Sequence, residues 1–126
     1  MKKLLFVLLL TMSSIVHANW NLIHEDADVK MYIEISSIQQ VGQFKRVWTK
    51  FEYSLDSELF LKFNDRSSRT YNEYDCREIK RRRLTSTFFK QPNLIEQSTN
   101  NNTVGEWEFI APNTVGKKMI EAVCKK

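Results

Sequence analysis

The chain has 126 residues, with 19 Lys and Arg against 15 Asp and Glu and a formal net charge of +4. Removal of Lys2 and Lys3 with the N-terminal segment described below would lower this charge to +2. The protein is then not basic overall, so any basic function must come from local clustering of charge. The remaining length suits one domain with a single core.

The chain begins with the pattern of a secretory signal peptide. Lys2 and Lys3 precede the apolar run Leu4–Leu10, and small residues favour cleavage after Ala18. A transmembrane anchor is the alternative, but the apolar run is short and is interrupted at Thr11. We expect residues 1–18 to be the signal peptide and residues 19–126 to form the domain. We then expect an exported protein, periplasmic, secreted or associated with the cell surface, with no stable membrane anchor after cleavage.

Strand patterns dominate the first part of the mature sequence. Segments rich in β-branched and aromatic residues predict strands at 20–24, 29–35, 44–54, 70–84, 85–90, 93–99 and 105–110. Gly42 is expected to make the turn in a polar connection before the third of these. Residues 56–69 are expected to form a short helical turn or an irregular loop.

The segment 44–54 alternates most clearly. One face carries Val47, Thr49, Phe51 and Tyr53. The other face carries Arg46, Lys50 and Glu52, with Trp48 among them. Trp48 is either covered by a helix or exposed to solvent, and we favour cover by the helix.

The end of the chain changes to a helical period. Pro112 precedes a polar start at Asn113 and Thr114. The apolar half of the helix then carries Val115, Gly116, Met119, Ile120, Ala122, Val123 and Cys124. We interpret Gly116 as permitting close approach to an aromatic side chain of the sheet. The predicted fold is α+β, an antiparallel sheet of about six strands closed on one face by this C-terminal helix.

The mature chain has two cysteines, Cys76 and Cys124. An even number in an exported chain favours one disulfide, with two free buried thiols as the alternative. Because the closed loop is long, the bridge is expected to stabilise the fold by about 4 kcal/mol. It would fasten the helix to the sheet.

Several sequence pieces together resemble one protein family. They are WNLI (20–23), MYIEISSI (31–38), RVW (46–48), YDCRE (74–78), WEFIAPNTVG (107–116) and EAVC (121–124). With them the chain resembles the surface-adhesin protein E family of Gram-negative bacteria. The resemblance implies a sheet tied to a C-terminal helix by a Cys76–Cys124 disulfide. It also implies binding of host matrix or serum proteins such as vitronectin and laminin, although this chain lacks the cysteine of a lipid-anchored member.

We expect that the protein is not an enzyme and that it has no catalytic site, metal site or cofactor. Once His17 leaves with the signal peptide, His24 is the only histidine, so a site with several histidine ligands cannot form. Bridged cysteines are neither ligands nor nucleophiles, and the chain has no nucleophile elbow and no glycine-rich phosphate loop. His24 beside Glu25 and Asp26 is interpreted as a turn residue at a strand end.

The basic run after Cys76 is the candidate binding site. Extended geometry places charge on both faces of the strand, so we expect this end to project past the core or to bulge. Pairing with the strand 44–54 would add three further cations. The candidate partner-binding residues are Arg77, Lys80, Arg81, Arg82, Arg83, Lys45, Arg46 and Lys50.

Two functions remain open at this point. The first is an exported, non-enzymatic binding module whose basic ridge contacts an acidic protein, glycan or lipid surface. Nucleic acid is excluded as a partner because the chain is exported. The alternative is a periplasmic structural or partner-binding protein with no host ligand, in which the charges guard a sheet edge. An exposed edge strand could also support a homodimer.

Overall fold

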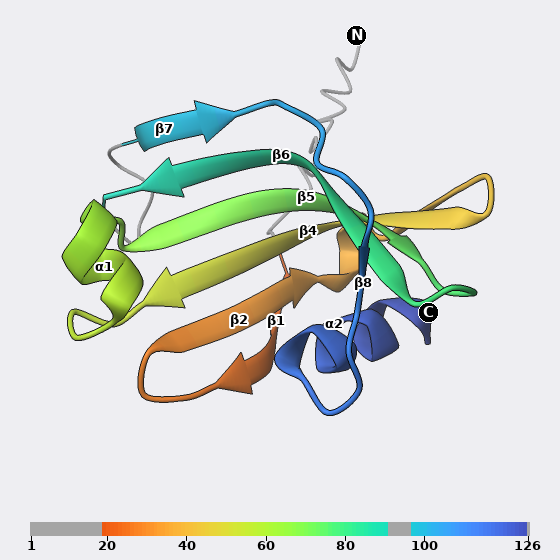
Figure 1. Cartoon of the computed structure of the whole chain (residues 1–126), viewed down its shortest axis with the longest axis horizontal. Coiled ribbons are helices and arrows are strands. Elements are labelled where there is room, and N and C mark those ends of the chain that lie inside the picture. The colour runs from red at the N-terminus through yellow and green to blue at the C-terminus, as the bar shows by residue number, and fades with distance from the viewer. Residues whose placement is uncertain (1–18, 91–96, 126) are drawn as a thin grey trace, which may run out of the picture.

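One antiparallel sheet of eight strands forms most of the part of the chain that the structure describes (Figure 1). The computed structural model describes residues 19–90 and 97–125; the expected signal peptide and the start of the expected strand 93–99 lie outside them. The strands are β1 (Trp20–Glu25), β2 (Val29–Glu34), β3 (Gln39–Val41), β4 (Phe44–Tyr53), β5 (Ser67–Asp75), β6 (Lys80–Phe89), β7 (Gln97–Asn101) and β8 (Glu108–Phe109). Their order is β1-β2-β4-β5-β6-β7, with short β3 on β4 and short β8 on β6. The prediction of an antiparallel sheet of about six strands is confirmed.

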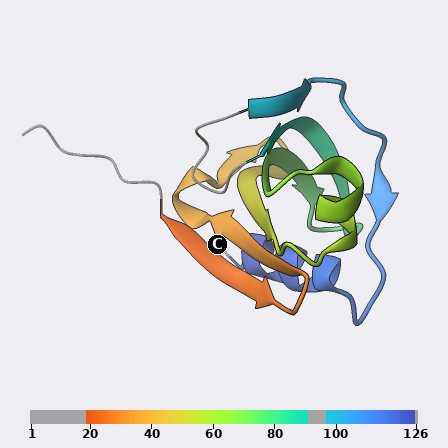
Figure 2. The ribbon, with the colours of Figure 1, turned by 90° about the vertical axis from the view of Figure 1, so that its left-hand side faces the viewer.

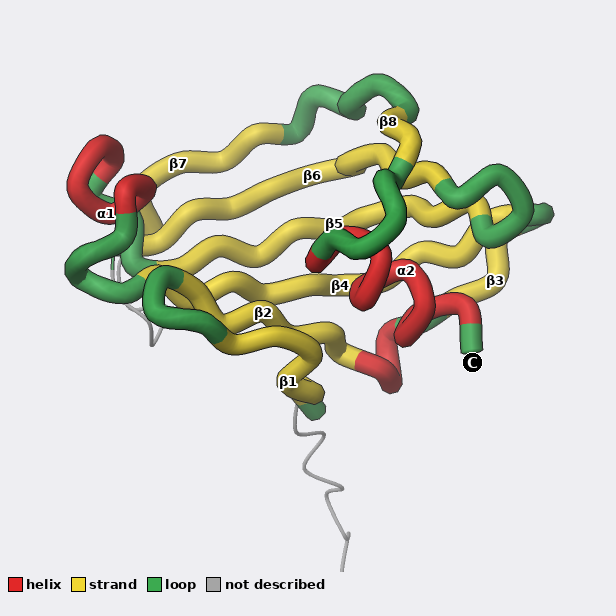
Figure 3. The backbone as a smooth tube through the Cα atoms, turned by 60° about the horizontal axis from the view of Figure 1, so that its bottom comes forward, coloured by secondary structure: helices red, strands yellow, loops and turns green. Residues whose placement is uncertain are grey.

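The sheet is strongly curved, and the C-terminal helix α2 (Val115–Cys124) lies on its concave side between β1 and β8 (Figure 2). Figure 3 shows the helix against one half of the sheet, opposite the short helix α1 (Glu58–Phe63) at the other end. Side chains alternate along each strand, so every second residue of β4 and β5 faces α2 and the others face outward. This alternation gives the sheet two chemically different faces.

The sequence explains why α2 forms and what it buries. The side chain of Thr114 caps the helix by accepting a hydrogen bond from the backbone N–H of Lys117, at 3.2 Å. The predicted apolar half turns to the sheet, where it shares a core of buried residues. These are Ile33, Val47, Tyr74, Met119, Ile120 and Val123.

The disulfide between Cys76 and Cys124 ties the last residue of α2 to the turn that follows β5, with their Cα atoms 5.9 Å apart. The pairing agrees with the predicted one, and neither cysteine of the chain is free. A helix of ten residues is marginal alone, so the bridge and the apolar face together hold it in place.

The predicted continuous strand 70–84 is wrong at its middle. The chain reverses at residues 76–79, between β5 and β6, and Ile79 adopts a positive φ of 54°. The carboxylate of Asp75 stabilises this turn, because its Oδ1 accepts hydrogen bonds from the backbone N–H groups of Arg77 and Glu78. The two halves of the predicted strand therefore pair with each other. The β5–β6 register shifts between Tyr71 and Asn72, so the bulge lies at Leu84, after the basic run, and residues 80–83 themselves pair in register with β5.

Four smaller expectations have different outcomes. Residues 56–69 contain the helix α1, capped by the hydroxyl of Ser57, and the expected strand 105–110 shortens to β8. Gly42 makes the expected turn with a φ of 60°. The interpretation of Gly116 is wrong, since a Cβ there would meet the side chain of Ile110 at 3.4 Å and no aromatic ring.

We predict that replacing both cysteines by alanine lowers the free energy of unfolding by about 4 kcal/mol, because the bridge closes a loop with a sequence separation of 48. Guanidinium unfolding followed by circular dichroism measures the change. Wild-type protein under reducing conditions is the control and should lose a similar amount. Equal stability with and without the bridge would show that apolar packing alone holds α2.

We further predict a loss of stability at alkaline pH that depends on Tyr74. Burial raises the pKa of this phenol to about 12, with the positive charge of Arg81 opposing the shift. An unfolded tyrosine titrates near pH 10, so the contribution of Tyr74 is complete below about pH 10 and is lost as pH rises towards about 12. Urea unfolding across this window should show a shallower decline for Tyr74→Phe than for wild type. If the stability of the two proteins declined equally with pH, the loss could not be assigned to the raised pKa of Tyr74.

Candidate partner-binding surface

The convex face of the sheet carries a band of aromatic and charged side chains. In β4 these alternate with Val47 and Thr49, which are buried on the α2 side. The pairing of β4 with β5 sets Arg46 opposite Glu73, and Trp48 opposite Tyr71. We call this band the convex strip; it consists of Trp20, Tyr32, Phe44, Arg46, Trp48, Lys50, Arg69, Tyr71, Glu73, Lys80, Arg82 and Trp107.

The buried carboxylate of Glu73 organises the centre of the strip. It is 1% exposed, and its two oxygens accept hydrogen bonds from two arginines. The Nε of Arg46 lies 2.7 Å from Oε2, and the Nε and Nη2 of Arg82 lie 2.8 and 2.7 Å from Oε1. Such charge-assisted bonds hold both guanidinium groups in fixed positions while about a third of each side chain stays exposed.

Aromatic rings flank this centre on both sides. Trp48 stacks on Tyr71 with ring centroids 4.9 Å apart. On the side of β6, Trp107 packs against Phe44 at 5.0 Å, and the guanidinium of Arg82 lies 4.7 Å from the centre of its indole. Trp48 is thus stacked on the convex face, away from α2, so the expectation that the helix covers it is wrong.

A second cluster lies towards the β1 edge. The ammonium of Lys50 lies 4.4 Å from the ring centre of Tyr32 and 5.0 Å from that of Trp20, and it pairs with Glu52 at 3.4 Å. The guanidinium of Arg69 lies 5.2 Å from the ring centre of Trp20. Cation–π contacts of this kind hold the cations beside the rings, and the side chain of Lys50 is 14% exposed.

Arg69 differs from the other cations of the strip. Within the described part of the chain it has no ion pair to a carboxylate, and its Nε is buried without a hydrogen-bond partner. Burial lowers the pKa of its guanidinium, and the negative charge of Glu34 opposes that shift. A guanidinium stays charged at neutral pH regardless. Arg69 and Glu34, with Trp20 and Trp48, line a shallow hollow of about 180 Å³.

The structure brings together only part of the predicted basic ridge. Arg46, Lys50, Lys80 and Arg82 lie on the convex strip, and Arg77 lies exposed in the turn before β6. The other three cations face the concave side, where each has a local partner.

The local partners give these three cations structural roles. Lys45 reaches the carbonyl oxygens of Val123 and Cys124 at 3.4 and 3.5 Å, at the negative end of α2. Arg81 pairs with Glu108 at 3.4 Å, and Arg83 donates to the carbonyl of Thr103. Sequence reasoning missed Glu73, Tyr71 and Arg69, although "RTYNEYD" alternates with period two and signalled them.

The described residues offer little for other chemistry. No group of three or more His, Cys, Asp or Glu lies close enough to hold a metal ion within 19–90 and 97–125. His24 contacts Asp26 at 2.8 Å in the β1–β2 turn, and Lys118 lies 3.3 Å from its other ring nitrogen. None of the helices in these ranges has the length and apolar character needed to span a membrane.

Comparisons with known proteins agree with this geometry. The family model described as surface-adhesin protein E matches residues 20–125. Crystal form II of Haemophilus influenzae protein E superimposes with a TM-score of 0.60 at 16% identity, covering 87% of this chain and 90% of that one. Protein E from non-typeable Haemophilus influenzae gives 0.56 at 13% identity, covering 89% and 79%. These structural similarities show that the chain shares the fold of those proteins. No curated protein sequence matches the chain.

We predict that Glu73→Gln destabilises the protein by about 2–4 kcal/mol, because it leaves two fixed guanidinium groups without their buried carboxylate. Glu108→Gln is the matched control, since it removes the same charge from an exposed partner of Arg81 and should cost at most about 0.5 kcal/mol. Urea unfolding of the two variants measures the difference. Equal losses would mean that Glu73 is no more than a surface ion pair.

Proposed function

The chain belongs to the surface-adhesin protein E family, and we propose that it is an exported, non-enzymatic binding module whose convex strip contacts a host matrix or serum protein. The family is one of surface adhesins rather than of enzymes. The signal-peptide pattern of residues 1–18 supports export.

The observation that carries this proposal is the pre-organised state of the convex strip. Trp, Tyr and Arg are the residue types that contribute most to binding energy in protein interfaces. Here they are held in place before any partner arrives, by Glu73 and by ring contacts such as that of Trp48 with Tyr71. Fixed side chains lose little conformational entropy on binding, which favours affinity.

Charge indicates what kind of partner surface fits. The strip carries five cations, Arg46, Lys50, Arg69, Lys80 and Arg82, whereas Glu73 is its one carboxylate and is buried between two of them. Nearby Glu34 and Glu52 reduce this excess towards the β1 edge. A net positive, aromatic surface of this kind is complementary to an acidic face of a partner protein.

The proposal therefore revises the set of contact residues. It retains Arg46, Lys50, Lys80 and Arg82 from the predicted ridge and adds Arg69, Trp48 and Tyr71. It omits Lys45, Arg81 and Arg83, because these face the concave side. It also omits Arg77, which lies in the turn before β6 and not on the strip.

We predict that the double variant Lys50→Gln, Arg69→Gln binds immobilised vitronectin or laminin about 10-fold more weakly, with a smaller dependence on salt. The matched control is Lys117→Gln, Lys118→Gln, which removes two charges from α2 and should leave affinity unchanged. Surface plasmon resonance at several salt concentrations measures both, and unfolding curves verify that the variants are folded. Equal weakening in both pairs would indicate non-specific attraction and would contradict a site on the convex strip.

Location gives an independent test of the same function. Fractionation of the producing cells, with protease treatment of intact cells, should find the protein at the cell surface or in the medium. A strictly periplasmic pool would contradict contact with host proteins and would favour a periplasmic partner instead.

A further inference from the structure

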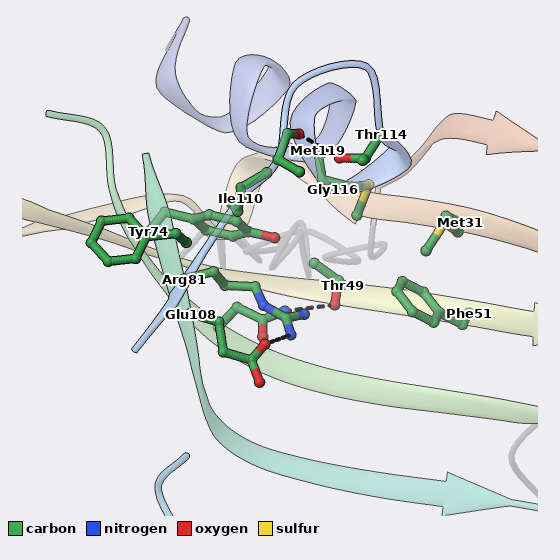
Figure 4. Close-up of a pocket in the computed structure, with 13 residues that line it drawn as sticks. Met31, Thr49, Phe51, Tyr74, Arg81, Glu108, Ile110, Thr114, Gly116 and Met119 are labelled. Atoms are coloured by element: carbon green, nitrogen blue, oxygen red, sulfur yellow. Dashed lines mark hydrogen bonds and ion pairs between the residues drawn. The ribbon is translucent and has the colours of Figure 1, made fainter. Parts of the chain in front are cut away.

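A half-open cavity lies on the concave face, away from the convex strip. It occupies about 260 Å³ beneath the start of α2 (Figure 4). Strands β2, β4, β5 and β6 form its floor, and β8 with the chain leading into α2 forms its roof. The volume is close to the lower end of the range found for small-molecule sites, roughly 300–1,000 Å³.

One wall of this cavity is polar. Thr49, Asn72 and Tyr74 are each at most 2% exposed, and their side chains line the wall from β4 and β5. The amide Nδ2 of Asn72 donates to the hydroxyl of Thr49 at 3.0 Å, but its carbonyl Oδ1 has no partner among the described residues. The hydroxyl of Tyr74 points into the space in Figure 4. The accessible surface of Asn72 Oδ1 is below 1 Å², so the open space does not reach this atom.

The opposite wall is apolar. Met31 and Phe51 lie at one end, and Ile110 and Met119 lie beneath the helix. Gly116 contributes no side chain, and it leaves open the space that a larger residue on the same helix face would enter. Gly116 therefore borders this cavity, not an aromatic ring as the sequence had led us to expect.

An exposed ion pair crosses the mouth. The guanidinium of Arg81 and the carboxylate of Glu108 lie 3.4 Å apart, with side chains 35% and 71% exposed. Pairs this exposed contribute little stability, so the mouth can open at small cost. Because the two charges cancel, the cavity offers no net charge to a ligand.

We propose that this cavity binds a small uncharged amphipathic molecule with a short apolar chain and an amide or similar group. The carbonyl of such a group accepts a hydrogen bond from the hydroxyl of Tyr74 or from the guanidinium of Arg81. The apolar chain packs between Met31, Phe51 and Met119. The site is separate from the convex strip, so each can exist without the other.

The chain offers a direct probe of this cavity. Met31 and Met119 both line it, and the other two methionines, Met1 and Met12, belong to the expected signal peptide. Isotope labelling of methionine methyl groups therefore places NMR probes at two positions on the apolar wall. We predict that titration with hexanamide shifts both signals saturably, with a Kd on the order of 1 mM for so small a molecule. Hexanoate and hexylamine share its chain but carry a charge, and they should bind at least about 10-fold more weakly.

Two substitutions link the shifts to the cavity. Gly116→Leu fills the space and should abolish the saturable shifts, while Tyr74→Phe should weaken binding by about 5-fold through loss of one hydrogen bond. Glu121→Leu is the control, because it adds the same side chain to the exposed surface of α2. Absence of saturable shifts with hexanamide would mean that water alone occupies the cavity. That outcome, equal binding of all three compounds, or unchanged binding in Gly116→Leu would overturn the proposal.

Discussion

The packing of α2 against the concave face of the sheet is the constraint on which both surfaces of the protein depend. The helix is too short to persist alone, and it is held by its buried apolar residues and by the bridge from Cys124 to the turn after β5. Because strand side chains alternate, the choice of which face meets the helix assigns every residue of β4 and β5 to one side. Val47 and Tyr74 go to the core, and Trp48 and Glu73 go to the convex face.

Glu73 fixes the side chains of the convex face, as the apolar core fixes those of the concave face. A sheet face that carries so many cations without a helix over it would be mobile and self-repelling. One buried carboxylate shared by two guanidinium groups both neutralises part of that charge and fixes the geometry around it. Buried ion pairs contribute little net stability compared with apolar packing, although removing one partner of such a pair is costly. The main effect of the Arg46–Glu73–Arg82 network is therefore to hold side chains of the convex strip in position, rather than to stabilise the fold.

The sequence predicts this protein well where local periodicity and global packing agree. The alternation of residues 44–54, the amphipathic end of the chain and the cysteine pair all favour one arrangement, and the structure has it. Prediction from the sequence fails at residues 76–79. There β-forming residues such as Ile79 occupy a turn, which Asp75 stabilises through two side-chain hydrogen bonds. No periodicity reveals such a turn. The error propagates, because once the chain reverses, the basic run lies beside β5 and divides between the two faces. Trp48 shows the other limit: alternation places it correctly beside Arg46, but only the tertiary structure determines which face receives the helix.

The division into two faces also has an energetic consequence. The convex strip and the concave cavity are built from alternating residues of the same strands, so Glu73 and Tyr74 are neighbours in sequence but point in opposite directions. Side chains that share no partner contribute nearly additively to stability, and coupling arises mainly within one network. Arg46, Glu73 and Arg82 form one such network, and Thr49 with Asn72 forms another. Changes on the convex face can thus alter partner contacts while the cavity and the core keep their packing. Arg81 and Arg82 are the exception, since they are adjacent on β6 and a shift of its backbone would move both at once.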